Sequence, residues 1–507
     1  MHTSDTFLPD WLMRCAHNRP EHLALQYDEI RWSFAKLDSE ASRLARQLAT
    51  LGVSEGSRVA LLAANSPNFV TCVHALTRLG AVLIPLNTRL TVDELRWQVR
   101  DAHVTLLVHD AGFLTIATQI IEAVPQLMQA AFAPLEKESN NISILSTLPE
   151  TEVVLRTLID LQATQAIMYT SGTTGNPKGA IITYGMQWWN AVSSALNLGH
   201  QPDDCWLACM PFFHIGGLSI LMRSVIYQIS VIVQQKFDPK VVNRAILEQH
   251  VTIISVVAVM LQRMLATLDA QNDSYPSTLR CVLLGGGPAP QPLLEACAAR
   301  NIPVVQTYGM TEACSQAVTL APADALRKLG SAGRPLPSVQ LRVMLDERPA
   351  QANEAGEIQL KGPTITPGYA NRPDATARAF HDGWLATGDI GYLDAEGYLY
   401  VLDRRSDLII SGGENVYPAE IEAVLLSHPD VAEAGVCGQP NVQWGQVPIA
   451  FVRVHEGSVV NTQELMEFAF QRLARYKQPQ AVYIVEQLPR NSSGKLLRRE
   501  LAGLFPL

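Results

Sequence analysis

The residues with the clearest chemical potential lie between Met168 and Gly179, directly after an apolar run typical of the end of a buried strand. Hydroxyl groups can donate to phosphate oxygens, glycines let the backbone approach a phosphate, and a lysine adds a compact positive charge. A Walker A motif is excluded because Pro177 precedes the lysine and Gly179 follows it. Such clusters are usually turns, but this pattern favours a phosphate-binding loop of Thr170, Ser171, Gly172, Thr173, Thr174, Gly175 and Lys178.

Five further segments carry residue types that suit a nucleotide site: Tyr308–Glu312, Thr387–Asp389, Leu402–Arg404, Ser411–Glu420 and Pro489–Lys495. With the loop, and in the same order over nearly the whole chain, they resemble the adenylate-forming enzymes. That family includes acyl-CoA synthetases, luciferases and the adenylation domains of peptide synthetases. The resemblance implies a ligase that uses ATP, Mg²⁺ and CoA, forms an acyl adenylate with release of pyrophosphate, and transfers the acyl group to a thiol.

The resemblance assigns the phosphates and the metal to a few residues. The loop 170–178 would hold the β- and γ-phosphates, Thr311 would contact the α-phosphate, and Glu312 would ligate Mg²⁺ through a hard carboxylate oxygen. This chemistry needs positioning and neutralised charge more than a covalent catalyst. Taken singly, Thr311 and Glu312 would equally suit a helix cap and a first-turn acid.

The nucleoside would be held by residues from separate segments. Asp389 would accept the ribose hydroxyls and Arg404 would also reach the ribose. The adenine would lie against Gly286, Gly287 and the ring of Tyr308, since bare backbone and an aromatic face both permit close contact. Without the surrounding motifs, Asp389 would be a turn residue and Arg404 a surface ion-pair partner.

Two C-terminal positions would serve the two half-reactions. In the family, a lysine at the place of Lys495 enters the site during adenylation and stabilises charge that moves between carboxylate and phosphate. Gly413, beside Gly412, would line a channel for the pantetheine arm of CoA after the small domain rotates. Alone, these residues would be an exposed basic residue and a flexible loop.

Two polar residues interrupt the apolar segment 205–235 and bear on the acid substrate. His214 lines the acyl pocket in the family, and Arg223 would bind a second substrate carboxylate. The alternative is a satisfied core histidine and an arginine paired with a structural carboxylate. Segments 193–199, 213–219, 285–290 and 308–316 are similar to the 2-succinylbenzoate–CoA ligases of menaquinone synthesis, which favours the substrate role.

The composition sets limits on partners and compartment. The 507 residues carry a net charge of −9 without a dominant basic cluster, which does not support nucleic-acid binding. The apolar run 251–261 is too short to span a bilayer, the N-terminus has no signal core, and the eight cysteines form no CxxC pair. We expect a cytoplasmic enzyme without stable membrane insertion, with small-molecule partners and an oligomeric state left open, a homo-oligomer included.

The elements that must position these residues alternate between strands and helices. Val59–Ala63, Pro67–Leu79 and Ala81–Pro85 predict a parallel βαβ crossover, and further apolar strands follow between residues 231 and 305. The resemblance implies a large multi-sheet α/β domain, residues 1–402, and a small mobile α+β domain, residues 403–507, with a hinge at about 403–407.

Three alternatives to this function remain at the level of the sequence. The first is another acyl- or aryl-CoA ligase on the same scaffold, acting on a medium-chain fatty acid or an aromatic acid. The second is a phosphotransferase or NTPase, which release of ADP rather than AMP would identify. The third is a non-catalytic nucleotide-binding or scaffold protein. The presence of a suitable residue at every expected reactive position argues against this alternative.

Replacing Lys495 with alanine should separate the two half-reactions. Adenylation should slow by about a hundredfold because an electrostatic contact made in the transition state is lost. Thioester formation from preformed adenylate should stay nearly unchanged. Pyrophosphate release and acyl-CoA formation, measured separately, check this; equal losses in both would contradict the role of Lys495.

Overall fold

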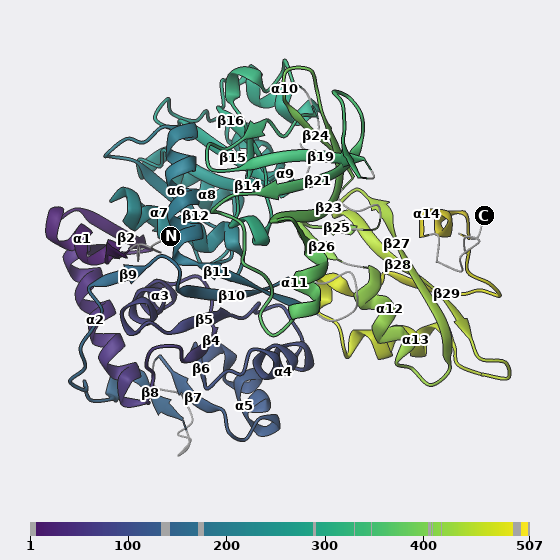
Figure 1. Cartoon of the computed structure of the whole chain (residues 1–507), viewed down its shortest axis with the longest axis horizontal. Helices are drawn as coiled ribbons and strands as arrows, with labels where there is room; N and C mark the ends of the chain where they lie inside the picture. Colours follow the sequence, from purple (N-terminus) through teal and green to yellow (C-terminus); the bar gives the residue numbers. More distant parts are fainter. Residues whose placement is uncertain are drawn as a thin grey trace.

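The computed structural model describes residues 7–132, 142–170, 177–286, 291–328, 330–345, 347–403, 407, 409–416, 418–489 and 498–504. In this part of the chain, strands form five sheets with helices on their faces. Figure 1 shows the N-terminal sheets in the larger part of the molecule, while α12 (Pro418–Leu426) and α13 (Thr462–Phe470) lie at one side with the last sheet. The predicted α/β class, with several sheets and a smaller α+β part, is confirmed.

A seven-stranded sheet occupies most of residues 58–183 and supplies both ends of the phosphate loop. The predicted crossover is confirmed, because β4 and β5 pair in parallel and α3 (Pro67–Leu79) connects them between a Ser66 cap and Gly80 at φ 67°. Thr170 and Lys178 face each other across the antiparallel pair β10 and β11. The sheet order is β11 (Lys178–Thr183), β10 (Thr164–Thr170), β5 (Val82–Pro85), β4 (Arg58–Leu62), β6 (Leu106–His109), β7 (Met128–Ala131) and β8 (Ser143–Ile144), with α4 (Val92–Asp101) and α5 (Leu114–Ala123).

A nine-stranded sheet brings the ends of its central parallel strands together. Val257, Gly285 and Tyr308 end three neighbouring strands, and open α/β sheets bind ligands at such carboxyl ends. The order is β18 (Arg334–Pro335), β17 (Val318–Leu320), β16 (Val304–Tyr308), β15 (Cys281–Gly285), β14 (Ile253–Val257), β12 (Cys205–Ala208), β13 (Ser230–Val233), β2 (Leu23–Tyr27) and β3 (Ile30–Ser33). The helices that accompany these strands are α1 (Trp11–Asn18), α2 (Phe34–Thr50), α8 (Pro239–Glu248), α9 (Ala258–Gln271) and α10 (Gln291–Ala299).

Two further helices, α6 (Tyr184–Leu198) and α7 (Ile215–Tyr227), pack against each other beside this sheet. Eleven of the thirteen residues of α7 are buried, which explains its almost continuous apolar sequence. Arg223 lies within this buried helix. None of the helices in the described ranges is long and apolar enough to cross a membrane.

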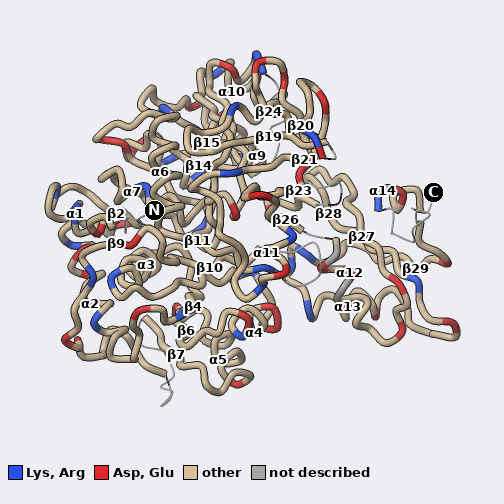
Figure 2. Tube along the Cα trace, in the orientation of Figure 1, with Lys and Arg blue, Asp and Glu red and all other residues tan. Residues whose placement is uncertain are grey.

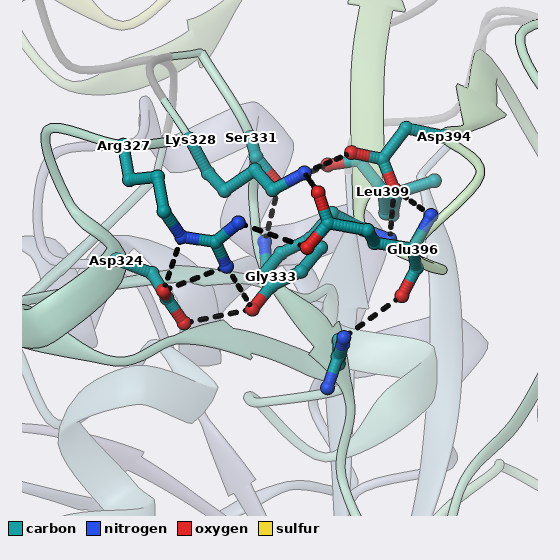
Figure 3. A network of polar contacts seen from close by, with 10 residues as sticks. Asp324, Arg327, Lys328, Ser331, Gly333, Asp394, Glu396 and Leu399 are labelled. Atoms are coloured by element: carbon teal, nitrogen blue, oxygen red, sulfur yellow. Dashed lines mark hydrogen bonds and ion pairs between the residues drawn. The ribbon is translucent and has the colours of Figure 1, made fainter.

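A six-stranded sheet carries Asp389 on its long strand β23. The β23–β24 hairpin is fixed to residues 324–334 by the polar network of Figure 3, in which Lys328 contacts Asp394 and Glu396. Arg334 also donates to the carbonyl oxygen of Glu396 at 2.9 Å. The order is β20 (Arg348–Pro349), β19 (Gln340–Leu345), β21 (Gly356–Lys361), β23 (Trp384–Leu393) and β22 (Phe380–His381), with β24 (Leu399–Asp403) paired to β23, and α11 (Pro373–Ala379) alongside.

The C-terminal residues build a separate five-stranded sheet. The order is β26 (Glu414–Val416), β25 (Ile409–Ser411), β28 (Gly445–Val454) and β27 (Val431–Asn441), with β29 (Ala481–Ile484) paired to β28 and the short helix α14 (Arg498–Leu501) at the end. A two-stranded sheet of β1 (Phe7–Pro9) and β9 (Leu158–Asp160) completes the strands described. The boundary at 402/403 remains a prediction, because residues 404–406 of the proposed hinge lie outside the described ranges.

A buried carboxylate fixes the start of the central strands of the nine-stranded sheet. Asp204 is 2% exposed and accepts two hydrogen bonds from Arg280, at 2.7 and 2.5 Å. Thr252 and the backbone of Gln201 donate to the same carboxylate at 2.8 and 2.9 Å. Burial alone would raise the pKa of Asp204, but these hydrogen bonds outweigh it and hold the pKa below its usual value.

Asp204→Asn should therefore lower the free energy of unfolding by about 3 kcal/mol at pH 7, because the Arg280 guanidinium loses its buried partner. The lowered pKa means that this contribution is complete above about pH 4 and is lost as the pH falls further. Urea unfolding at several pH values measures the effect. Asp203→Asn, at a neighbouring carboxylate whose side chain is 93% exposed, is the matched control and should change little; equal effects would contradict the assignment.

Candidate active site

A cavity of about 520 Å³ lies between the carboxyl ends of the central strands and the C-terminal sheet. It brings together most of the described residues that the sequence singled out: Thr170, Lys178, His214, Arg223, Gly286, Thr311, Glu312, Asp389 and Gly413. Tyr308, at the end of β16, is not among the lining residues and donates its hydroxyl to Asp389. Ser171, Gly172, Thr173, Thr174, Gly175, Gly287, Arg404 and Lys495 lie outside the described residues.

Cationic and acidic groups meet at the phosphate end of the cavity. The ammonium of Lys178 lies 5.3 Å from the centre of the Tyr369 ring, and the hydroxyl of Tyr369 donates to Glu312 at 2.9 Å. No group of three or more His, Cys, Asp or Glu side chains in the described ranges could hold a metal. Mg²⁺ typically combines one or two carboxylates with substrate phosphates. Glu312, beside the ends of the phosphate loop, fits that set of donors.

The turn that carries Thr311 and Glu312 has an unusual backbone. Cys314 and Ser315 both have positive φ angles, of 55° and 91°. The turn folds back on Gly309, where a Cβ atom would lie 1.5 Å from the carbonyl oxygen of Ser315. Only glycine fits there, and the tight fold fixes the turn against the end of β16.

The nucleoside end is organised around Asp389. Its carboxylate accepts the Tyr308 hydroxyl at 2.7 Å, and its backbone donates to Thr387 at 3.0 Å. The neighbouring Gly388 donates its backbone N–H to Glu357 at 3.1 Å. Gly286, at φ 81°, lines the cavity nearby on the end of β15. These contacts hold the Asp389 carboxylate rigidly in the cavity wall.

Arg223 supplies a buried positive charge to the same cavity. It is 2% exposed, its Nη2 donates to Asn190 at 2.5 Å, and its guanidinium lies 5.4 Å from the centre of the Trp206 ring. Among the described residues, Nε has no hydrogen-bond partner and no carboxylate forms an ion pair with the guanidinium. Burial lowers the pKa of Arg223. A buried cation in this state attracts an anionic ligand.

His214 lies at the start of α7 and connects the cavity to the C-terminal residues. Its Nε2 lies 3.2 Å from the carboxylate of Glu414, which also pairs with Arg89. Burial, and secondly the charge of Arg89, lower the pKa of His214 to about 4. The lowered pKa favours the neutral ring at neutral pH, in which Nε2 can donate to Glu414.

The C-terminal part closes the cavity through a loop and a buried ion pair. Gly413, at φ 85°, lies so near Val257 that a Cβ atom would approach its side chain to 3.1 Å. Lys477, 4% exposed, donates to Glu94 of α4 at 2.8 Å and to Glu420 of α12 at 2.7 Å. Figure 2 shows charges of both signs close together in this region, between α11, β26 and α12.

The three ionisable side chains Lys477, Glu94 and Glu420 influence one another's pKa values. Burial raises the pKa of Glu420 to about 7, although Lys477 acts in the opposite direction. Burial also favours neutral Glu94, but the charge and hydrogen bond of Lys477 outweigh it and lower the pKa of Glu94. The Lys477–Glu94 contact is therefore a charged bond between the two parts of the chain.

Sequence reasoning missed four residues that shape this site: Asn190, Tyr369, Glu414 and Lys477. Glu414 directly follows Gly413, which the sequence did single out, so its position in the same motif could have identified it. Tyr369 lies far from Glu312 in the sequence, and Asn190 belongs to an ordinary amphipathic helix. Their roles arise from tertiary contacts, which no local pattern records.

Comparisons with known proteins agree over the whole chain. A model of the AMP-binding enzyme family matches residues 12–370, and one of the AMP-binding enzyme C-terminal domain matches residues 420–495. The chain is 52% identical to the 2-succinylbenzoate–CoA ligase of Geobacillus kaustophilus, with 99% of each chain covered. It is 44% identical to a double mutant of o-succinylbenzoate CoA synthetase (MenE) of Bacillus subtilis bound with the product analogue OSB-NCoA, with a TM-score of 0.91 and coverage of 98% and 99%.

A second structure of the Bacillus subtilis synthetase gives a lower score. Its complex with the acyl-adenylate intermediate OSB-AMP has a TM-score of 0.74 at the same 44% identity, with 98% of both chains covered. At nearly equal identity and coverage, the present structure superposes more closely on the product-analogue complex than on the acyl-adenylate complex.

Glu94→Gln should weaken the contact between Lys477 of the C-terminal part and α4. The helix itself should be undisturbed, because glutamine keeps the side-chain hydrogen bond of the helix cap formed with Thr91. Acyl transfer to CoA from preformed adenylate should slow by about tenfold, since a charged hydrogen bond is lost, while adenylate formation should hold. Rapid-quench measurement of both half-reactions checks this. Asp93→Asn, on the exposed side of the same helix, is the matched control; a variant slowed only in adenylation would contradict the role.

Proposed function

The chain belongs to the AMP-binding enzyme family, and we propose that it is a 2-succinylbenzoate–CoA ligase of menaquinone synthesis. In the first step the succinyl carboxylate attacks the α-phosphorus of ATP, the acyl adenylate forms and pyrophosphate leaves. In the second step the CoA thiol attacks the acyl carbon, the thioester forms and AMP leaves. The product is 2-succinylbenzoyl-CoA.

The observation that carries the choice of acid is the buried guanidinium of Arg223, to which no described residue offers a carboxylate. The substrate has two carboxylates: one reacts, and the other, on the benzoate ring, keeps its charge throughout. A charged carboxylate in a cavity needs a cation, and an arginine can meet it bidentately or through water. Arg223 lines the cavity that also contains Thr311 and Glu312, so one bound molecule can address both ends. The sequence relatives support the same substrate.

The residues of the first step act by holding charge in place. Lys178 and Thr170 would bind the outgoing phosphates, Thr311 the α-phosphate and Glu312 the metal ion. A Mg²⁺ ion held there would supply positive charge to the phosphate oxygens. Lys495 would stabilise the shared charge of the attacking carboxylate and the α-phosphate. Asp389 and Arg404 would fix the ribose, and Gly286, Gly287 and Tyr308 the adenine, so that the α-phosphate faces the acid.

The second step would take place with the C-terminal part of the chain in the position seen in this structure, where Gly413 and Lys477 contact the larger part. Gly413 and Val257 both line the cavity, and a side chain at position 413 would narrow the space at this edge, where the pantetheine arm of CoA would enter. His214, neutral and hydrogen-bonded to Glu414, adds no positive charge beside the acyl group that the thiol must reach. The Lys477–Glu94 bond holds the C-terminal part in this position while the thiol attacks.

We also propose that the enzyme works in the cytoplasm on small molecules alone. All eight cysteines are free thiols, seven of them buried, as is typical of a reducing compartment. Both co-substrates, ATP and CoA, are cytoplasmic metabolites. A homo-oligomer is compatible with this proposal, and light scattering of the purified protein would measure its mass.

A substrate panel tests the proposed function directly. With ATP and CoA, kcat/KM for 2-succinylbenzoate should exceed that for 4-oxo-4-phenylbutanoate, which lacks only the ring carboxylate, by at least about a hundredfold. Benzoate, cinnamate and medium-chain fatty acids should be poorer still, and AMP should be the nucleotide product. In Arg223→Met the preference should collapse. A wild-type enzyme that prefers a monocarboxylic acid would overturn the substrate assignment.

A further inference from the structure

Asn190 is the described side chain that holds the guanidinium of Arg223. It lies on α6, is 1% exposed, and accepts a hydrogen bond from Nη2 of Arg223 through its Oδ1 at 2.5 Å. Its Nδ2 donates to the carbonyl oxygen of Gln316 at 2.8 Å and approaches that of Ala313 at 3.5 Å. These contacts fix the orientation of the amide, because its oxygen must face the arginine and its nitrogen the two carbonyls.

An amide at this position has a different effect from a carboxylate. An aspartate would pair with Arg223 and cancel its charge, leaving nothing to attract an anion. Asparagine is neutral, so it orients the guanidinium while leaving its positive charge uncompensated. Among the described residues, Nη2 of Arg223 donates to Asn190 and Nε has no hydrogen-bond partner.

Asn190 also connects the arginine to the nucleotide end of the cavity. Ala313 and Gln316, whose carbonyls it contacts, belong to the turn that begins with Thr311 and Glu312. That turn contains the positive φ angles of Cys314 and Ser315 and leaves no room for a side chain at Gly309. A second bond joins the two helices, since the Tyr227 hydroxyl, one turn after Arg223, donates to the Ala191 carbonyl at 2.5 Å.

We propose that Asn190 is a positioning residue for substrate specificity: it aims an uncompensated Arg223 at the remote carboxylate of a dicarboxylic acid and fixes its distance from the turn of Thr311 and Glu312. This inference rests on the proposed function and adds to it the residue that keeps the specificity cation charged. Asn190 itself does not touch the reacting atoms.

The test compares three substrates of the full-length enzyme: 2-succinylbenzoate, 4-oxo-4-phenylbutanoate, and the analogue of 2-succinylbenzoate in which a carboxamide replaces the ring carboxylate. In Asn190→Asp, kcat/KM for 2-succinylbenzoate should fall at least about tenfold, mainly through KM, because a charged hydrogen bond to the substrate is weakened. The value for 4-oxo-4-phenylbutanoate should hold, and the neutral carboxamide analogue should gain relative to the dicarboxylate. Asn197→Asp, the same change on the exposed face of α6, is the matched control and should behave as wild type.

A general structural defect would lower the rates for both acids and raise KM for ATP, and that result in Asn190→Asp would overturn the proposal, as would an unchanged preference. Asn190→Ser, which lacks the new charge, should lose less of the preference for 2-succinylbenzoate than Asn190→Asp. If the aspartate variant does not fold, the ratio of kcat/KM for the two acids in the serine variant tests the proposal. The proposed function is judged separately, on the wild-type preference between the two acids.

Discussion

A buried arginine without an acidic partner is the constraint on which the substrate end of this molecule depends. Burying a guanidinium is costly unless an anion meets it, and the fold arranges two helices and the Trp206 ring around Arg223 without supplying one from the described residues. The neutral Asn190 holds the group in place. In the proposed function the ligand supplies this negative charge, which would explain how a scaffold shared by many acid–CoA ligases selects a dicarboxylic acid.

The rest of the cavity depends on contact between distant parts of the chain. Central strands of the nine-stranded sheet deliver the nucleotide turn and Val257, the six-stranded sheet delivers Asp389, and the C-terminal sheet delivers Gly413. The buried Lys477–Glu94 bond joins the last of these to α4. In the proposed function, one cavity would serve chemistry at phosphorus and at carbon, with the C-terminal part supplying some of the residues that face the substrate.

The sequence predicted the α/β class, the crossover at residues 59–85 and nine of the residues that line the cavity, because glycine, hydroxyl and charged residues at fixed spacing record local geometry. It could not predict partners that meet only after folding. Arg223 illustrates both sides: its lone charge in an apolar helix was visible, while the absence of a described acidic partner was not. The contact of Tyr308 with the adenine stays a prediction, and the structure adds the hydrogen bond from its hydroxyl to Asp389.

The most direct measurement of the central claim is calorimetric titration of the enzyme with two acyl-adenylate mimics in which a sulfamoyl group replaces the phosphate. One mimic carries the ring carboxylate and the other has hydrogen in its place. We expect the first to bind at least about a hundredfold more tightly to the wild-type protein, and the difference to vanish when Arg223 is replaced by methionine. Equal affinities in the wild-type protein would contradict the account.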